Sequence, residues 1–522
     1  MGIYLNPGNT MFQRSLDSRI YVDKSGLIAR LNDEVLTRDC YVCVSRPRRF
    51  GKSTTLDMLA AYYDRTCDSR SQFENLAVAG DSSYEKHLNK YDVIRIVMQD
   101  FMADNADELI ERLEERVARE VAQAYPDVAS PDDEKLSNLL ARVFQKSGVP
   151  FVILIDEWDC VMRDFQDDEA AQKKYLDWLR GLLKDKPYVG LAYATGILPI
   201  KKYGQHSALN MFNEVSVLNA VPFSEFTGFT ESEVAQLCEQ YNTDASEIAR
   251  WYDGYNIDGV MSYNPRSVVM ALNKGVFDSY WTRTETFEAL RRYIVLNFDH
   301  LREKIVELIG GGLVSVNTAK FQNDMTSLAS SDDVLTLLTH LGYLTYDRSR
   351  EAVRIPNTEV MLEFVNCIED GGWEAVADAI AESKALVDAT ISRDSEQVAG
   401  LIERAHRDNA SVLRYNDENS LACVLSIAYY AARRDYRIER EAPAGKGYAD
   451  LVFWPRPGRD VPAFVVELKA GGSAADAVAQ IRSRGYADAL RDHPDALLVG
   501  VSYDPSPKSD AYKTHECVIE PI

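Results

Sequence analysis

Short apolar runs alternate with amphipathic stretches along residues 41–200 of the chain. The runs have the length and composition of buried strands, and they cover Tyr41–Ser45, Val93–Met98, Phe151–Ile155 and Val189–Ala194. The stretches between them repeat apolar residues every three or four positions, as helices do, and they cover 52–63, 107–123, 135–145 and 170–183. Strands that alternate with helices predict an α/β fold whose parallel sheet is covered on both faces.

The middle of the chain, from about Phe223 to Asp408, has a mostly helical pattern. Within it, Val334–Leu341 predicts a helix, and 343–346 with 353–356 predict a short hairpin, an order that resembles a winged helix. Nucleic-acid recognition by such a module needs basic groups, whereas Asp332, Asp333 and Glu359 are acidic. We therefore favour an internal packing module. We interpret residues 369–408 as a polar helical connector.

The last hundred or so residues return to an α/β pattern. Two strands, Tyr448–Trp454 and Ala463–Lys469, flank a turn rich in Pro and Gly and predict a hairpin. A helix over 474–490 and a last strand over Leu497–Val501 follow. These shifts in pattern predict three domains, 1–222, 223–409 and 410–522, of which the first and third are α/β.

Composition excludes several classes of protein. The 522 residues are 46% hydrophobic and 27% charged, which is ordinary for a globular protein. No apolar run approaches the length of a membrane span, and the first residues do not read as a signal peptide, so we expect a cytoplasmic protein. The eight cysteines are scattered. Cys40 and Cys43 form a CxxC pair inside a predicted strand, and without a second ligand pair this favours neither zinc nor redox chemistry.

The net charge of −23 argues against a general nucleic-acid coat. The charge is uneven, because residues from Ser411 onward carry 14 Lys/Arg and 16 Asp/Glu and are nearly neutral. Contact with DNA is therefore compatible with this tail and not with the acidic body.

The segment from Cys43 to Thr55 carries the strongest chemical signal. It places Gly51-Lys52-Ser53 between an apolar strand and a helix, as a phosphate-binding loop does. Free N–H groups at the helix start suit a triphosphate, Lys52 would reach the β- and γ-phosphates, and Ser53 would bind Mg²⁺. The nucleotide contacts would come from Arg49, Phe50, Gly51, Lys52, Ser53 and Thr54. Arg46 stands where the pattern has its first Gly, and the structural alternative is a turn capped by Ser53.

A second signal lies about a hundred residues further on. The run Phe151–Ile155 ends in Asp156 and Glu157, so both carboxylates fall at the carboxyl edge of the predicted sheet, where ligands bind. Asp156 would hold Mg²⁺ with Ser53, and Glu157 would orient or deprotonate the attacking water. Thr195, at the end of the next strand, would sense the γ-phosphate. An extra strand between the loop and the acidic pair indicates the ATPase type with a catalytic Glu. The alternative is a core strand that ends in a charged turn.

The tail carries a separate set of acids and a lysine. In the predicted hairpin, Asp450 and Glu467 lie on partner strands and would share a Mg²⁺ ion. Lys469 shares a face with Glu467 and would assist attack on a phosphodiester, while Glu418 would complete the metal shell. Asp followed by Glu-x-Lys is a weak pattern, and the alternative is an ordinary domain with an exposed Glu–Lys pair.

These motifs together carry a family resemblance over nearly the whole chain. The loop Arg46–Ser53 resembles that of the bacterial AAA-ATPase-like proteins with a C-terminal PD-(D/E)XK nuclease-like domain, a family in which Arg at position 46 is expected. The other segments that match are 154–157, 195–197, 251–255, 263–265, 415–419, 445–450, 466–469 and 480–481. The resemblance implies ATP binding and hydrolysis, and a nuclease fold built on Asp450, Glu467 and Lys469, with Gln480 and Tyr486 on the following helix.

From the sequence we expect a Mg²⁺-dependent ATPase coupled to a metal-dependent nuclease domain that acts on DNA. The alternative is a non-catalytic, ATP-driven switch or assembly protein whose tail only binds nucleic acid or protein. An oligomer or a protein partner is compatible with both hypotheses. Arg266 and Arg283 are candidates for a cation that reaches the nucleotide.

Overall fold

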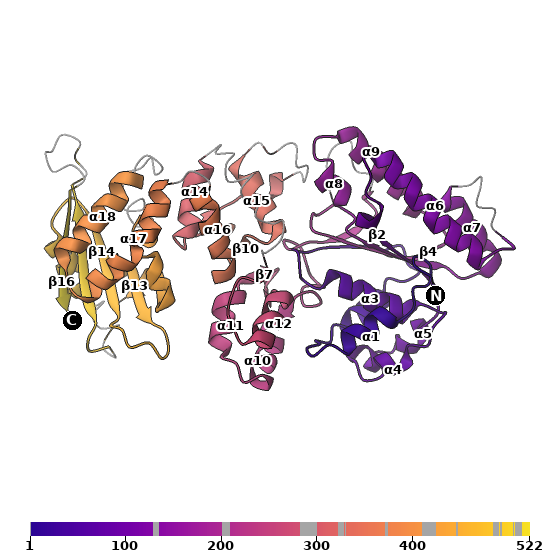
Figure 1. The fold of residues 1–522 in the computed structure, drawn as a ribbon, viewed down its shortest axis with the longest axis horizontal. Helices are drawn as coiled ribbons and strands as arrows, with labels where there is room; N and C mark the ends of the chain where they lie inside the picture. Colours follow the sequence, from indigo (N-terminus) through magenta and orange to yellow (C-terminus); the bar gives the residue numbers. More distant parts are fainter. Residues whose placement is uncertain are drawn as a thin grey trace. The chain divides into compact units, whose positions relative to one another are not determined.

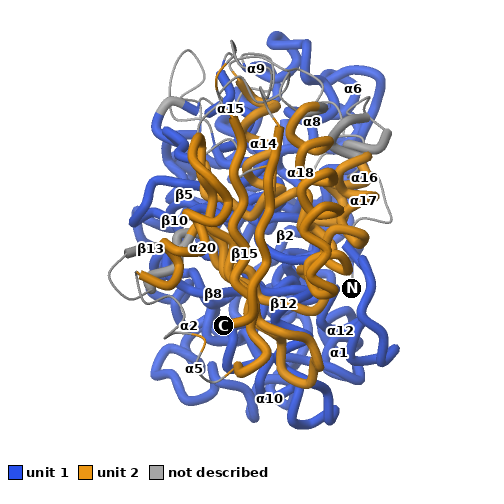
Figure 2. The backbone as a smooth tube through the Cα atoms, turned by 90° about the vertical axis from the view of Figure 1, so that its left-hand side faces the viewer, with its two compact units in different colours: residues 1–283, 315–359 blue, residues 284–314, 360–522 orange. Residues whose placement is uncertain are grey.

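The computed structural model describes residues 2–128, 135–200, 209–281, 300–321, 328, 330–370, 374–409, 424–444, 447–483, 490, 493–504, 506 and 514–522. The chain forms two compact units (Figure 2), one of residues 1–283 and 315–359 and the other of residues 284–314 and 360–522. The division into three domains stays a prediction. No helix among the described residues has both the length and the apolar content needed to cross a membrane.

The first unit is built on a five-stranded parallel sheet, as the alternating pattern predicted. Its order is β2-β3-β4-β1-β5, with strands β1 (Tyr41–Ser45), β2 (Asp92–Val97), β3 (Phe151–Asp156), β4 (Val189–Gly196) and β5 (Asn213–Val215). Strand β4 separates β1 from β3, which confirms the predicted additional-strand type of P-loop sheet. The register pairs Ser45 with Gly196 and Asp156 with Thr195, so the strands end together at one edge.

Helices cover both faces of this sheet (Figure 1). Helices α1 (Thr10–Leu16) and α3 (Lys52–Tyr63) lie on one face, and α6 (Ala106–Ala124), α7 (Leu136–Ser147) and α9 (Glu169–Leu183) lie on the other. In α6, Leu109, Leu113, Val117 and Val121 are fully buried and recur at the helical period. The Asn105 side chain accepts the backbone N–H of Glu108 and caps the start of α6.

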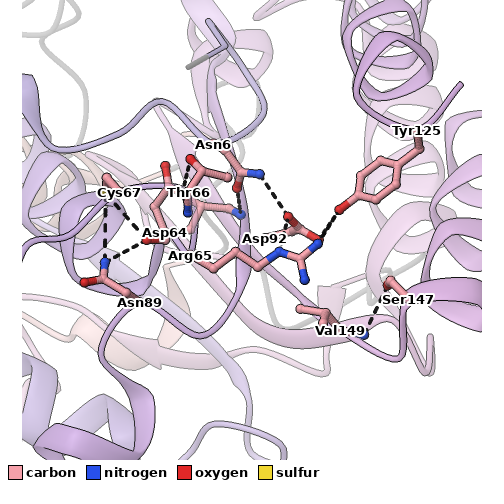
Figure 3. Close-up of polar contacts among 11 residues, drawn as sticks. Asn6, Asp64, Arg65, Thr66, Cys67, Asn89, Asp92, Tyr125, Ser147 and Val149 are labelled. Atoms are coloured by element: carbon pink, nitrogen blue, oxygen red, sulfur yellow. Dashed lines mark hydrogen bonds and ion pairs between the residues drawn. The ribbon is translucent and has the colours of Figure 1, made fainter.

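A network of polar groups fixes the N-terminal segment to the start of β2 (Figure 3). The buried Asp92 carboxylate accepts from the Asn6 amide (2.9 Å), the Arg65 Nε (2.9 Å) and the Tyr125 hydroxyl (2.6 Å). A second carboxylate, that of Asp64, accepts the backbone N–H of Gly8 at 2.7 Å. These contacts tie segments that are far apart in the sequence to one end of the sheet.

Replacing Asp92 by Ala should destabilise the first unit by about 3 kcal/mol, because Arg65, Tyr125 and Asn6 would lose a buried acceptor together. Thermal melting of the full chain measures the effect. The matched variant Tyr125→Phe leaves the carboxylate in place, removes one donor to Asp92 and one acceptor of Arg65, and should cost less, about 1 kcal/mol. Equal losses in the two variants would contradict the role given to the carboxylate.

Beyond the sheet, the first unit continues with α10 (Glu231–Gln240), α11 (Ala245–Tyr252), the hairpin β7 (Tyr255–Ile257) and β8 (Val260–Tyr263), and α12 (Pro265–Lys274). Asn264 caps α12 by accepting the N–H groups of Arg266 (3.0 Å) and Ser267 (3.3 Å). Gly254 has a φ of +100°, and a Cβ there would lie 2.1 Å from the Pro356 carbonyl oxygen, so only glycine fits.

The predicted helix and hairpin of the winged-helix-like piece are confirmed as α15 (Ser331–Leu341), β10 (Thr345–Asp347) and β11 (Ala352–Arg354). Helix α15 begins earlier than predicted because Ser330 and Asp333 form a capping box. The buried Glu359 accepts from the Ser267 hydroxyl (2.8 Å) and from the backbone N–H of Trp281 (2.8 Å). Asp332 accepts the backbone N–H of Asn317 (3.1 Å), so all three acids that argued against DNA binding have structural partners.

The second unit contains a five-stranded mixed sheet in the order β12-β13-β14-β15-β16. Its strands are β12 (Tyr436–Ala444), β13 (Gly447–Pro455), β14 (Phe464–Ala470), β15 (Leu497–Tyr503) and β16 (His515–Pro521). The predicted β13–β14 hairpin is confirmed. The sequence analysis missed β12, and its interpretation of 497–501 as the last strand was wrong because β16 follows and pairs with β15.

Both faces of the second sheet carry helices. Helices α17 (Glu374–Ile391) and α18 (Ser395–Asn409), the predicted connector, lie against one face (Figure 1). Helix α20 (Ala474–Ser483) packs on strands β14 and β15, and Val478 and Ile481 are buried among residues such as Val465 and Leu498. Because side chains alternate along a strand, Glu467 and Lys469 share the face of Val465 and project toward α20.

Candidate functional site

The loop between β1 and α3 has the backbone of a phosphate cradle. Gly51 has a φ of +84°, and no atom lies within 4 Å of the position that a Cβ would occupy, so its backbone borders open space. Arg49 also has a positive φ, of +68°. Helix α3 begins at Lys52, and its first N–H groups have no partner within the helix. Ser53 and Thr54 are exposed at this helix start, where a phosphate would meet them.

Lys52 lies across the same loop. Its Nζ donates to the carbonyl oxygens of Arg46 (3.0 Å) and Pro47 (2.8 Å). Burial lowers its pKa to about 8, and the nearby carboxylate of Asp156 opposes that change. The ammonium group is therefore held at the loop in a position from which an anion would recruit it.

The start of α3 lies next to the acidic end of β3, as the two sequence motifs predicted. The Ser53 hydroxyl donates to Asp156 Oδ2 at 2.7 Å, although the two residues lie 103 positions apart. A hydroxyl oxygen and a carboxylate beside a phosphate cradle are the hard ligands that Mg²⁺ prefers, so these residues fit the metal that such a fold implies. Among the described residues, no three His, Cys, Asp or Glu side chains gather into a metal site by themselves. Water and phosphate oxygens would complete the shell here.

Glu157 and Asp159 frame this edge together with an arginine that the sequence analysis missed. Glu157 has a φ of +53° and a side chain that is 42% exposed, so it can meet solvent. The Arg163 guanidinium lies 3.5 Å from Glu157 Oε2 and 3.5 Å from Asp159 Oδ2. Burial lowers the pKa of Arg163, but Asp159 and Glu157 outweigh it and raise the pKa overall. The spacing of four residues from Asp159 to Arg163 on a helix was the available signal.

Asp159 and Thr195 are tied to the sheet edge. Asp159 Oδ2 accepts the backbone N–H groups of Ile197 (3.0 Å) and Leu198 (2.8 Å), which fixes the chain after β4. The buried Thr195 hydroxyl donates to the Val44 carbonyl at 3.0 Å. Its predicted role as a γ-phosphate sensor stays a prediction.

The Arg at position 46, which departs from the usual loop pattern, is an anchor. Its fully buried guanidinium donates from Nε to the Thr227 hydroxyl (2.7 Å) and from a terminal nitrogen to the Val215 carbonyl (3.1 Å). The loop thus gains side-chain bonds to the segment after the sheet, and a Gly would make none of them.

Arg48 and Phe50, also in the loop, contact residues that follow the parallel sheet in the sequence. The Arg48 carbonyl accepts from the Asn264 side chain at 3.4 Å and from the Trp281 indole N–H at 3.3 Å. The buried Phe50 packs edge-on against Tyr255, with ring centroids 5.1 Å apart. Five residues distant in sequence therefore hold the loop in place, and a substitution at any of them would alter the loop conformation. They are Val215, Thr227, Tyr255, Asn264 and Trp281.

Cations gather beside the cradle. Burial lowers the pKa of Arg49, and the neighbouring charges of Arg266 and Arg48 lower it further, so the three guanidinium groups lie close enough to repel one another. A bound anion would relieve this repulsion. Arg283, the other candidate cation, lies outside the described residues.

The predicted nuclease residues converge in the second unit. Asp450 Oδ2 accepts the backbone N–H of Leu468 at 2.7 Å, which brings β13 against β14 between Glu467 and Lys469. The Gln480 side chain on α20 donates to Glu467 Oε1 and accepts from Lys469 Nζ. Two carboxylates, one ammonium group and one amide therefore lie at a single end of the hairpin.

The chemistry of this set fits a divalent cation, since Asp450 and Glu467 supply hard oxygen ligands from adjoining strands. Glu467 is only 2% exposed, and a buried carboxylate is costly unless cations or donors face it. Glu418, predicted as a further ligand, and Tyr486, predicted beside Gln480, lie outside the described residues. The metal role of this pair stays a prediction.

Two family models match the chain. Residues 10–205 match the predicted AAA-ATPase family, and residues 416–507 match the PD-(D/E)XK nuclease superfamily. Both matches agree with the resemblance that the sequence motifs carried, and they cover the phosphate loop, the acidic strand end and the Asp450–Lys469 hairpin.

The chain is also similar to individual proteins. An uncharacterised protein from the vnfD 5′ region of Azotobacter chroococcum mcd 1 is 26% identical over 95% of both chains. The Walker-type ATPase paby2304 of Pyrococcus abyssi is 16% identical, with a TM-score of 0.37 over 66% of this chain and 97% of its own. The ORC2 protein of Aeropyrum pernix, in ADPNP–ADP complexes, is 13% identical, with a TM-score of 0.31 over 70% of this chain and 98% of its own.

Proposed function

With an AAA-ATPase-like domain and a PD-(D/E)XK nuclease-like domain on one chain, we propose that the protein is a Mg²⁺-dependent ATPase coupled to a metal-dependent nuclease that acts on DNA. One observation carries the ATPase half: the Ser53 hydroxyl at the start of α3 lies 2.7 Å from Asp156 at the end of β3. A helix tip with free N–H groups and a carboxylate that meet in this way support a metal–triphosphate site.

In the proposed reaction, the N–H groups from Gly51 to Ser53 bind the phosphates, and Lys52 leaves its loop carbonyls to contact the β- and γ-phosphates. Ser53 and Asp156 would hold Mg²⁺, which supplies positive charge against the developing charge on the phosphates. Glu157, whose side chain reaches solvent beside Asp156, would accept the proton of the attacking water.

In the tail, Asp450 and Glu467 would hold the metal that polarises a phosphodiester. Lys469 would stabilise charge on the phosphate oxygens, and Gln480 positions both side chains because it bonds Glu467 and Lys469 at once. The near-neutral charge of this tail, compared with the acidic body, supports placing DNA here.

An ATPase assay on the purified full chain tests the proposal. We expect phosphate release that requires Mg²⁺ and stops when a chelator is added. The proposed coupling of the two domains also predicts that added DNA increases the rate of phosphate release. A hydrolysis rate that does not change when DNA is added would contradict the coupling but would still support the proposed ATPase activity. ATP binding without hydrolysis, together with intact DNA, would identify a non-catalytic switch instead.

A further inference from the structure

The Arg163 guanidinium, on the short helix α8 (Cys160–Asp164), lies between two carboxylates that differ in freedom. Its Nη2 is 3.5 Å from Glu157 Oε2, and its Nε is 3.5 Å from Asp159 Oδ2. The Asp159 side chain is fully buried, whereas the Glu157 side chain is 42% exposed. Burial therefore fixes one of the two acids, and the other has room to turn toward solvent.

Asp159 sets the position of the guanidinium. Its Oδ2 accepts the N–H groups of Ile197 and Leu198, and its buried Oδ1 accepts no hydrogen bond from the described residues. A Cβ at Gly196 would lie 2.7 Å from this Oδ1, so the end of β4 passes the carboxylate this closely because it lacks a side chain there. A buried carboxylate with an unpaired oxygen is costly unless a cation faces it, and Arg163 is that cation.

Glu157 has much less support. Within the described part of the chain, its carboxylate forms a hydrogen bond or ion pair with Arg163 and with no other side chain. A half-exposed glutamate without a partner samples several rotamers. A general base must lie within hydrogen-bond reach of the proton that it accepts, so this freedom would reduce its efficiency.

We propose that Arg163 is a positioning residue, which holds the Glu157 carboxylate in the orientation from which it accepts the proton of the attacking water. The inference rests on the proposed ATPase reaction and adds the residue that orients its base. A guanidinium is planar and carries five N–H donors in a fixed geometry, so it can face two acids at once. Through Asp159, this bridge also connects the base to the chain that follows β4.

Turnover and ATP affinity of Arg163→Lys in the full chain test the inference. Lysine keeps a positive charge beside the buried Asp159, so the fold should survive, but a single ammonium group does not reproduce the bridge to Glu157. We expect turnover at saturating ATP to fall on the order of 10–10²-fold, as it does when a reacting group is misplaced by about 1 Å. ATP binding, measured by calorimetry, should stay unchanged. Arg180→Met, which replaces an exposed arginine on α9, is the control and should behave as the wild type.

A double-mutant cycle with Glu157→Gln separates positioning from a structural role. Once the carboxylate is an amide, no base remains to be oriented, so adding Arg163→Lys should change the slow turnover of Glu157→Gln by less than about twofold. Single-turnover release of labelled phosphate measures these slow rates. If Arg163→Lys slows both backgrounds by the same factor, its role is structural and the inference fails.

Two further outcomes overturn the inference while the ATPase stands. If Arg163→Lys turns ATP over as fast as the wild type, Glu157 needs no positioning by Arg163. If the variant is faster than the wild type, Arg163 restrains the base instead of orienting it. By contrast, if the wild type hydrolyses no ATP, or if Glu157→Gln is as active as the wild type, the proposed reaction itself fails and the inference fails with it.

Discussion

Replacing Glu157 by Gln should reduce ATP turnover by about 10³-fold and leave ATP binding almost unchanged. The substitution keeps the size of the side chain but removes its ability to accept a proton. Glu157 is half-exposed at the end of β3, next to the carboxylate that meets Ser53, so it can reach a water beside the γ-phosphate. Phosphate release at saturating ATP measures turnover, and calorimetry measures binding.

Two further variants make this result specific. Lys52→Ala should lose turnover through the binding step, because the cradle loses its cation. Glu169→Gln, an exposed substitution at the start of α9, should behave as the wild type. If Glu157→Gln turns ATP over at a rate within a few-fold of the wild type, Glu157 is not the base of the reaction. If Lys52→Ala binds ATP normally, the loop is not the phosphate-binding site.

The core of the first unit was predictable because its signals are local. The strands of the sheet are short, continuous apolar runs, and helices α6, α7 and α9 repeat their buried residues at the helical period. Helix α3 is buried on most of its surface and was recognisable from the loop before it. The Gly51–Ser53 and Asp156–Glu157 motifs stand at the ends of these elements. Because parallel strands end at one edge of a sheet, these motifs alone predict that Ser53 lies near Asp156.

The supports of the loop were not predictable in this way. Arg46 bonds Thr227, 181 positions away, and nothing in either local pattern marks the pair. Asn264 could be predicted only as a helix cap, yet it also donates to the loop carbonyl of Arg48. Long-range hydrogen bonds depend on how the chain folds back on itself, which hydrophobic periodicity does not encode.

The missed strands of the second unit have a different cause. Strand β16, His515–Pro521, is partly exposed and carries Glu516 and Glu520, so it lacks the continuous apolar run of a central strand. Strand β12 mixes charged residues with few apolar ones in the same way. Both lie at the edges of the sheet, where strands face solvent and their hydrophobic pattern is weakest.

In the tail, Asp450→Asn should abolish Mg²⁺-dependent nicking of plasmid DNA, with a loss on the order of 10²–10³-fold. Asn retains an oxygen that can accept the Leu468 N–H, so the β13–β14 contact survives while the negative charge that would bind the metal is lost. The expected result is therefore a folded protein with normal ATP turnover and no cleavage. Asp460→Asn, in the exposed turn between β13 and β14, is the matched control.

Lys469→Ala separates catalysis from metal binding at the same site. Removal of its ammonium group should slow cleavage while Mg²⁺ still raises the melting temperature, because the two carboxylates remain. In Asp450→Asn, that Mg²⁺-induced rise should shrink as well. If Asp450→Asn and the wild type nick DNA at the same rate, the activity comes from a contaminant or another site. If neither nicks DNA but both bind it, the tail is a binding module, and the Glu467–Gln480–Lys469 contacts hold the hairpin to α20 rather than serve a reaction.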